Sequence, residues 1–226
     1  MGGNRRQGGH AVIESISDAV QLAVLALCFT LALVRALRER STVWTSIACF
    51  YACMLLGNVY WFGYLIVFGE TPIYSYIADM GWIAGYVFLA MLLAETDRAR
   101  NVSALLPASL IPIVLCAACC IFYIATSGSV LLNIVDNGLL AIIGFYAVRG
   151  IAAHSDSSKH VSKLAANKAF HWAVLAFVIV EQALWISSSF LEHGPIAAVN
   201  AYIILSYVFT LAYAAILVCA LRSDMR

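Results

Sequence analysis

The side chains of this sequence best suited to chemistry are acidic and amide groups placed inside apolar runs. Glu14, Asp18 and Gln21 recur at spacings of four and three, which puts them on one face of a helix. Ionisable groups in the hydrocarbon region of a membrane are costly, so they indicate ligand or ion sites. The candidate ligand-binding residues are Asp18 from this face, and Asn58 and Trp61, Asp79 and Trp82, Asp136 and Asn137, Glu181 and Trp185, and Asn200 from the later runs.

Every Lys and Arg is expected at a cytoplasmic helix end or in the N-terminal tail, so none accompanies these groups at their depth. Glu181 is expected about 11 residues from the outer end of its helix, so it lies ~16 Å deep at 1.5 Å per residue. A carboxyl group at that depth must be protonated, hydrated in a cavity or matched by a cation from outside the protein. Asp79 and Asp136 face the same choice less severely.

Two interpretations of this polar set stay open. In the first, it forms an outward-facing cavity rimmed by Trp61, Trp82 and Trp185, which would bind a small ligand that is cationic or forms hydrogen bonds. In the second, the polar groups only hydrogen-bond between helices and hold the bundle together. Gly81 and Gly85 form a G-x-x-x-G pattern that is typical of close helix packing.

The sequence gives little support for an enzyme. It contains no G-x-S-x-G, no H-E-x-x-H and no phosphate-binding loop. The last apolar run has no Lys, which excludes a retinal Schiff base there, and the five His do not pair at zinc-ligand spacing. The seven Cys are interpreted as packing residues. We therefore expect no metal and no cofactor, and acid/base catalysis by Asp79, Asp136 or Glu181 is kept only as an alternative.

Composition sets the fold class. Hydrophobic types make up 63% of the chain and charged types 11%, against about 45–50% and about 25% in soluble domains. A spanning helix needs ~20 mostly apolar residues, and the sequence predicts an all-α, polytopic membrane protein with a disordered tail at 1–10, a transmembrane domain at 11–222 and a cytoplasmic tail at 223–226. The seven predicted spans are 12–36, 42–68, 73–94, 104–126, 129–152, 167–191 and 197–221.

The positions of the basic residues predict the orientation. Eleven of the 13 Lys and Arg residues lie in or beside the first, third and fifth connections or at the C-terminus, and only Arg5 and Arg6 lie on the other side. The positive-inside rule places the C-terminus in the cytoplasm and the N-terminus outside. The net charge of +1 gives no case for a nucleic-acid partner. The lipid bilayer is the expected partner.

A weak internal repeat is visible. The segment W-F-G-Y…G-E-T-P-I…G-Y-V-F-L-A begins at Trp61, and W-I-S-S…E-H-G-P-I…S-Y-V-F-T-L-A begins at Trp185. Asp18 matches Asp136 at a similar offset, near 120 residues. The pattern favours two parallel three-helix halves joined by the fourth helix, an arrangement found in transporters. Chance similarity between apolar segments is the alternative.

One stretch of about 60 residues carries a resemblance to a known family. A basic turn at 38–40 and Trp44 precede Gly57-Asn58…Trp61, and an outer turn with Pro72 precedes Ala78-Asp79…Trp82…Tyr86. This pattern resembles the seven-helix membrane input domains of bacterial diguanylate cyclases and sensor histidine kinases. Asn58 stands where that pattern suggests an acidic residue, and the chain ends four residues after Arg222 without a cyclase or kinase domain.

The resemblance implies a sensor-like module in a bacterial plasma membrane. Such a module needs a cytoplasmic signalling partner, expected to dock on 153–168 and the other basic loops. The alternative is a small-solute transporter built from the two three-helix repeats. The inner halves of the predicted helices hold fewer polar groups than the outer halves. This difference favours ligand binding without passage.

Overall fold

A computed structural model describes residues 4–69, 72, 76–100, 107–127, 130–152, 164, 167–188 and 196–224, with the side chains of 4–14, 99–100, 127, 196–200 and 224 left aside. Within these residues every regular element is a helix. The elements are α1 (Asn4–Glu39), α2 (Thr42–Phe68), α3 (Tyr76–Arg100), the 3₁₀ turn η1 (Pro107–Ser109), α4 (Leu110–Ser127), α5 (Val130–Ala152), α6 (Lys168–Ser188) and α7 (Ile196–Asp224).

The seven α-helices are each long and apolar enough to cross a membrane. The prediction of an all-α polytopic membrane protein is therefore confirmed. The ends of the helices follow local chemistry: α2 stops at Phe68 because Gly69 adopts a left-handed conformation (φ 72°) and donates its N–H to the Leu65 carbonyl. The turn between α1 and α2 is closed in the same way by Arg40, at φ 48°.

The two ends of the chain differ from the sequence prediction. Helix α1 begins at Asn4, so residues 4–10 are helical where a disordered tail was predicted, although the apolar span itself begins at Ser15. Helix α7 continues to Asp224, beyond the predicted end at 221. No proline lies in either extension, and each added helical residue gains a backbone hydrogen bond.

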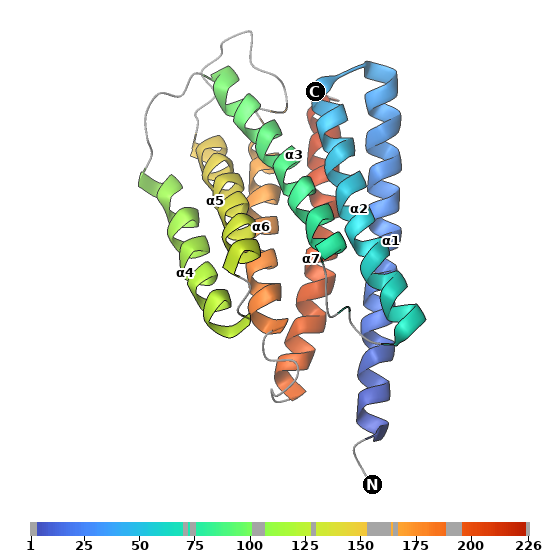
Figure 1. Cartoon of the computed structure of the whole chain (residues 1–226). Coiled ribbons are helices and arrows are strands. Elements are labelled where there is room, and N and C mark those ends of the chain that lie inside the picture. The colour runs from blue at the N-terminus through green and yellow to red at the C-terminus, as the bar shows by residue number, and fades with distance from the viewer. Residues whose placement is uncertain are drawn as a thin grey trace.

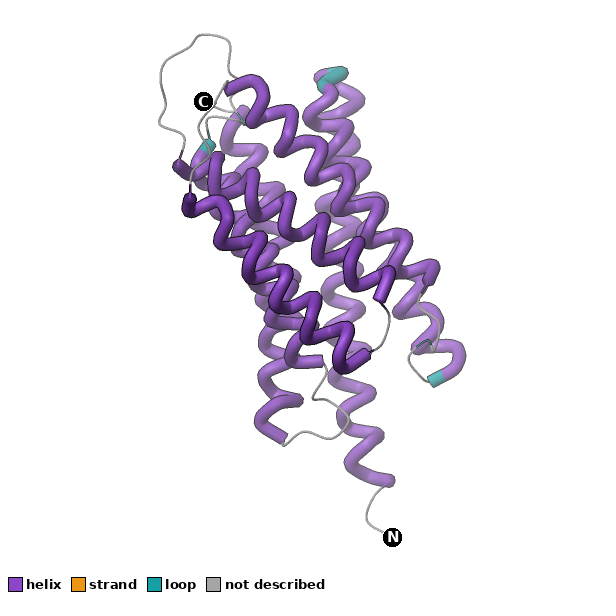
Figure 2. Tube along the Cα trace, turned by 60° about the vertical axis from the view of Figure 1, so that its left-hand side comes forward, coloured by secondary structure: helices purple, strands orange, loops and turns teal. Residues whose placement is uncertain are grey.

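Six of the helices form a closed ring. Neighbours pack in the order α1, α2, α3, α5, α6, α7 and back to α1, while α4 packs outside the ring against α5 and α6. Figure 1 shows α4 at one side of the bundle, and in the turned view of Figure 2 the helices run roughly parallel to one another. This order is the one that two three-helix halves joined by a fourth helix would give.

Glycines set the spacing between α2 and α3. A Cβ added at Gly81 would lie 2.9 Å from the Gly57 nitrogen and 3.0 Å from the Cys53 carbonyl oxygen, and one at Gly85 would meet the Met54 side chain. The two backbones therefore approach more closely than larger residues would allow. Close packing through the G-x-x-x-G pattern is what the sequence predicts.

Aromatic side chains fill the middle of the ring. Phe50, Tyr51, Phe177, Phe209 and Tyr213, which we call the aromatic floor, are all buried and pack against one another, mostly in tilted or edge-to-face arrangements. The Tyr51 hydroxyl donates to the Tyr213 carbonyl at 2.7 Å and so ties α2 to α7 across the ring. The floor separates the half of the bundle where α1 begins from the half where α1 ends.

Candidate functional site

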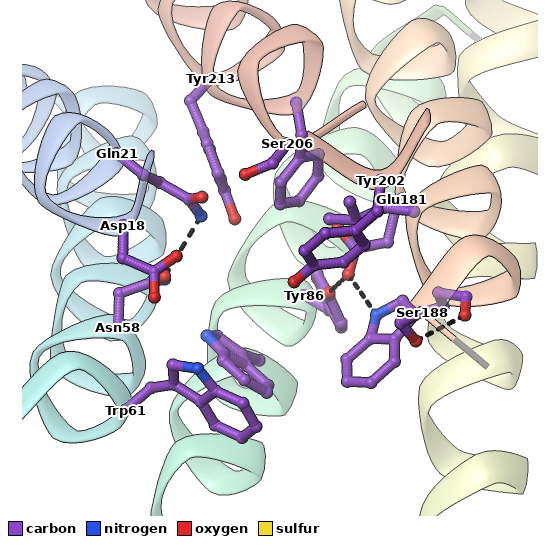
Figure 3. Close-up of a pocket in the computed structure, with 14 residues that line it drawn as sticks. Asp18, Gln21, Asn58, Trp61, Tyr86, Glu181, Ser188, Tyr202, Ser206 and Tyr213 are labelled. Atoms are coloured by element: carbon purple, nitrogen blue, oxygen red, sulfur yellow. Dashed lines mark hydrogen bonds between the residues drawn. The ribbon is translucent and has the colours of Figure 1, made fainter. Parts of the chain in front are cut away.

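A cavity of about 210 Å³ lies inside the ring, on the side of the aromatic floor predicted to face outside. Five of the six ring helices contribute to its wall, and α5 does not. Figure 3 shows these side chains converging from the different helices. The lining residues are Asp18, Gln21, Asn58, Trp61, Trp82, Tyr86, Glu181, Leu184, Trp185, Ser188, Tyr202, Ser206, Phe209 and Tyr213.

Glu181 is the most constrained group of the cavity. Its side chain comes from α6 and is only 4% exposed. One carboxyl oxygen, Oε1, accepts hydrogen bonds from the Tyr86 hydroxyl at 2.6 Å and from the Trp185 indole N–H at 2.8 Å. The other oxygen, Oε2, is buried and has no hydrogen-bond partner among the described residues. A buried acceptor without a donor is costly, so this oxygen is a natural point for a ligand donor.

The opposite wall is built by α1 and α2. Asp18 and Gln21 come from one face of α1, and the Gln21 amide donates to Asn58 Oδ1 at 3.2 Å. Asn58 in turn donates to the Met54 carbonyl at 2.8 Å, which fixes the orientation of its amide. Figure 3 places Asp18, Gln21 and Asn58 together, across the cavity from Glu181 and Tyr86. The cavity therefore has a carboxyl group on each of two facing walls.

Three indole rings form a continuous aromatic surface between these walls. The ring centres of Trp61 and Trp82 are 5.9 Å apart, and those of Trp82 and Trp185 are 6.0 Å apart with nearly perpendicular planes. Such rings attract cations that lie over their faces. The sequence prediction of a cavity bordered by these tryptophans matches this geometry.

The cavity gathers some of the predicted site residues and leaves others outside. The six that line it are Asp18, Asn58, Trp61, Trp82, Glu181 and Trp185. Asp79, Asp136 and Asn137 are not among the residues that line it. The side chains of Asn200 and Glu14 fall outside the described part of the chain.

Asn137, which lies outside the cavity, hydrogen-bonds to neighbouring side chains and backbone. Gln182 donates to Asn137 Oδ1 at 2.9 Å, and the Asn137 amide donates to the Asn133 carbonyl. On α4, the Tyr123 hydroxyl donates to the Gln182 carbonyl at 3.1 Å. These bonds join α4, α5 and α6. Among the predicted residues, Asn137 thus holds helices together, while Glu181 lines the cavity.

Several cavity residues escaped the candidate set. Gln21 and Tyr86 lie on polar faces that the sequence pattern does reveal, one turn from Asp18 and Trp82 respectively. Tyr202, Ser206, Phe209 and the other lining residues of α7 give no such signal, because aromatic and hydroxyl side chains are ordinary in spanning helices. Their position follows only from the way α7 closes the ring.

The described residues contain no group of three or more His, Cys, Asp or Glu side chains that could hold a metal ion. Compared with known proteins, the chain matches no family model, no curated protein and no solved structure. The conclusion at this point rests on the molecule itself: it is a multi-pass membrane protein whose helices enclose a polar, aromatic-lined cavity.

Proposed function

We propose that this chain is a ligand-binding membrane module of the sensor type, and that its cavity binds a small organic cation. The observation that carries the proposal is Glu181: a carboxyl group 4% exposed, with one oxygen lacking a donor, in a cavity lined by three indoles. An ammonium group would donate to that oxygen and lie against the indole faces.

The charge of the cavity supports a cation over an anion. Among the described residues, its lining contains two acidic side chains and no Lys, Arg or His. Among the described residues, the charged partners of Arg35 and Arg149 are Glu39 and Asp97, at the inner ends of the helices. A buried carboxylate without a protein cation is stabilised when the ligand supplies the positive charge.

The test is ligand binding by the purified protein in detergent, measured as a shift in melting temperature and by calorimetry. We expect primary alkylamines to raise the melting temperature of the wild type, and Glu181→Gln to abolish the shift while the protein stays folded. Asp79→Asn is the matched control, because it also removes a carboxyl group from a spanning helix but from outside the cavity lining. A Glu181→Gln variant with an unchanged amine response would overturn the proposal.

A transporter is the second candidate, favoured by one observation. The ring of two three-helix halves around a central cavity resembles the repeat architecture of proteins that alternate between two open states. The aromatic floor argues against passage, because five buried rings separate the cavity from the inner half of the bundle. Uptake of a radiolabelled amine into proteoliposomes would favour the transporter, while binding without uptake would favour the sensor.

Orientation is part of the proposal, since a sensor of external ligands needs its cavity to open outward. Val130 and Thr42 are exposed residues at opposite ends of the bundle. In a cysteine-free background, Val130→Cys should react with an impermeant thiol reagent added to intact cells and Thr42→Cys should not. The reverse labelling would place the N-terminus in the cytoplasm. The docking of a signalling partner on 153–168 stays a prediction, since most of that segment lies outside the described residues.

A further inference from the structure

The aromatic surface of the cavity begins at the Glu181 carboxyl group. The Trp185 indole N–H donates to Glu181 Oε1 at 2.8 Å, and the Trp185 ring meets Trp82 edge to face, with ring centres 6.0 Å apart. Trp61 continues this row, with its ring centre 5.9 Å from that of Trp82. Figure 3 shows the Trp61 indole and Glu181 on different sides of the open space. A molecule that is held at Glu181 and extends into the cavity therefore runs along indole rings.

The rest of the lining is also aromatic rather than aliphatic. Half of the described side chains that line the cavity are aromatic, and Leu184 is the one aliphatic side chain among them. Phe209 and Tyr213 of the aromatic floor belong to this lining. Aromatic rings attract one another edge to face and in offset stacks, an attraction that saturated groups of the same size lack. The wall therefore favours a ligand with an aromatic ring over one with an aliphatic chain.

Glu181 determines the polar end of the ligand. Its Oε2 atom is buried and has no hydrogen-bond partner among the described residues, whereas Oε1 already accepts hydrogen bonds from Tyr86 and Trp185. A primary ammonium group has three N–H donors, so it can satisfy Oε2 and also supply a positive charge. A quaternary ammonium has no N–H, and a neutral hydroxyl donates without the charge. Only the primary or another N–H-bearing amine provides both.

The volume of the cavity limits the size of the ligand. A cavity of ~150 Å³ in a protein core accepts a benzene molecule, and this cavity measures about 210 Å³. The difference leaves room for a few further non-hydrogen atoms. One aromatic ring with a short aliphatic arm and an amine therefore fits the space.

We infer that the cavity recognises a small arylalkylamine, with its ammonium group at Glu181 Oε2 and its aromatic ring against Trp61 and Trp82. This inference rests on the proposed binding of an organic cation and names the class of that cation. Both indoles are half-buried, so part of each ring remains for the ligand to cover. The carboxyl group then recognises the charge, and the indoles recognise the ring.

The experiment compares matched ligands by calorimetry on the full chain in detergent. Phenethylamine carries both features, 2-cyclohexylethylamine has a saturated ring instead, and 2-phenylethanol has a hydroxyl in place of the ammonium. We expect phenethylamine to bind about three- to tenfold more tightly than 2-cyclohexylethylamine, the range that aromatic pairing contributes. Hydrophobicity alone would give the opposite order, because the saturated ring has the larger apolar surface. We expect 2-phenylethanol to bind at least about tenfold more weakly, since the charge-assisted hydrogen bond is lost.

A small set of variants tests the position of the ring. Trp61→Leu should lower the advantage of phenethylamine over 2-cyclohexylethylamine by at least about half and leave butylamine binding unchanged, while Trp61→Phe should retain most of the advantage. Trp172→Leu is the matched control, because it also removes an indole from a spanning helix but from an exposed position outside the cavity lining. It should behave as the wild type.

The ligand series and the variants distinguish the two levels of the proposal. Equal or tighter binding of 2-cyclohexylethylamine by the wild type would overturn the arylalkylamine inference and leave the proposed cation binding intact. A Trp61→Leu variant that keeps the full advantage of phenethylamine would do the same. Equal binding of phenethylamine and 2-phenylethanol, or no binding by any amine, would overturn both.

Discussion

The first three helices, α1–α3, and the last three, α5–α7, which we call the two halves, contain a similar pattern of polar residues with different roles. In the first half, α1 and α2 are joined by Gln21 and Asn58, and a tryptophan, Trp61, follows three residues after Asn58. In the second half, α5 and α6 are joined by Asn137 and Gln182, and Trp185 follows Gln182 at the same spacing. In each pair the asparagine amide also donates to the carbonyl four residues earlier on its own helix.

The pairs differ in what they face. Gln21 and Asn58 line the cavity, whereas Asn137 and Gln182 do not, and Gln182 meets Tyr123 of the outer helix α4 instead. The residues that precede Asn58 in α2 and Gln182 in α6 also have different roles. Gly57 precedes Asn58 and packs against Trp82, while Glu181 precedes Gln182 and faces the cavity. The halves therefore share a motif, but each presents a different face of its middle helix to the cavity.

The junctions between the halves differ as well. Near the C-terminal ends of α3 and α5, the Arg149 guanidinium contacts both carboxyl oxygens of Asp97 at 3.1 Å, with little exposure of either side chain. At the other junction, Ser17 of α1 and Ser206 of α7 share a hydroxyl hydrogen bond of 2.8 Å. Between the described residues, α3 and α5 are thus joined by an ion pair, whereas α7 and α1 are joined by a bond between two neutral hydroxyl groups. The following predictions test how far this contrast between halves and junctions holds.

The largest effect is expected at the ionic junction. Arg149→Ala should lower the free energy of unfolding by about 3 kcal/mol, because it leaves the Asp97 carboxylate half-enclosed without its partner. Denaturation in mixed detergent micelles measures this loss. The double variant Asp97→Asn with Arg149→Met should recover much of it, since neither charge then remains. A single variant as stable as the wild type would show that the ion pair does not hold the halves together.

A smaller effect is expected where glycine sets helix spacing. Gly81→Ala should cost about 1–3 kcal/mol, because the added Cβ meets the backbone of α2 and neither helix can move alone. Gly138→Ala in α5 is the matched control, since a Cβ there contacts nothing within 4 Å. We expect it to be neutral or to stabilise the helix by up to about 1 kcal/mol. Equal costs at both positions would mean that the α2–α3 contact is not specially close.

The amide pairs should respond unequally. Gln182→Leu should cost about 1 kcal/mol of stability, because Asn137 loses a buried donor that water cannot replace. Gln21→Leu should cost less, since Asn58 lines a cavity that water can enter, but it should weaken amine binding more. Melting temperatures with and without butylamine separate the two effects. Equal stability losses with equal amine responses would contradict the division into a structural pair and a cavity pair.

The smallest effect is expected at the junction between α7 and α1. Ser17→Ala should lower the free energy of unfolding by about 0.6 kcal/mol, the average for a hydrogen bond between spanning helices. The same denaturation assay applies, with Thr30→Ala as a control, because Thr30 bonds only to the Ala26 carbonyl of its own helix. A loss comparable with that of Arg149→Ala would remove the contrast between the junctions.

Much of the fold could be predicted from the sequence because a bilayer imposes simple rules. Apolar runs of about 20 residues define the spans, and the loop-by-loop alternation of basic residues predicts which ends lie together. The same pattern indicated that α2, α3 and α6 carry tryptophans and polar groups at matching depth, and Trp61, Trp82 and Trp185 do lie together. The spans, the sides of the loops and the depth of the tryptophans all depend on how far along a helix a residue lies, and this position can be counted in the sequence.

The rotation of each helix about its own axis was decided only by the tertiary structure. Asp18 and Asp136 match in the repeat, yet only Asp18 lines the cavity, because α1 closes the ring while α5 also packs against α4. Glu181 faces the cavity and Gln182 faces away, because neighbouring residues differ by about 100° around a helix. The rules that locate membrane spans do not say which of the two faces points inward. Which face points inward depends on side chains of neighbouring helices, such as Gly57 against Trp82, and these contacts exist only once the ring has closed.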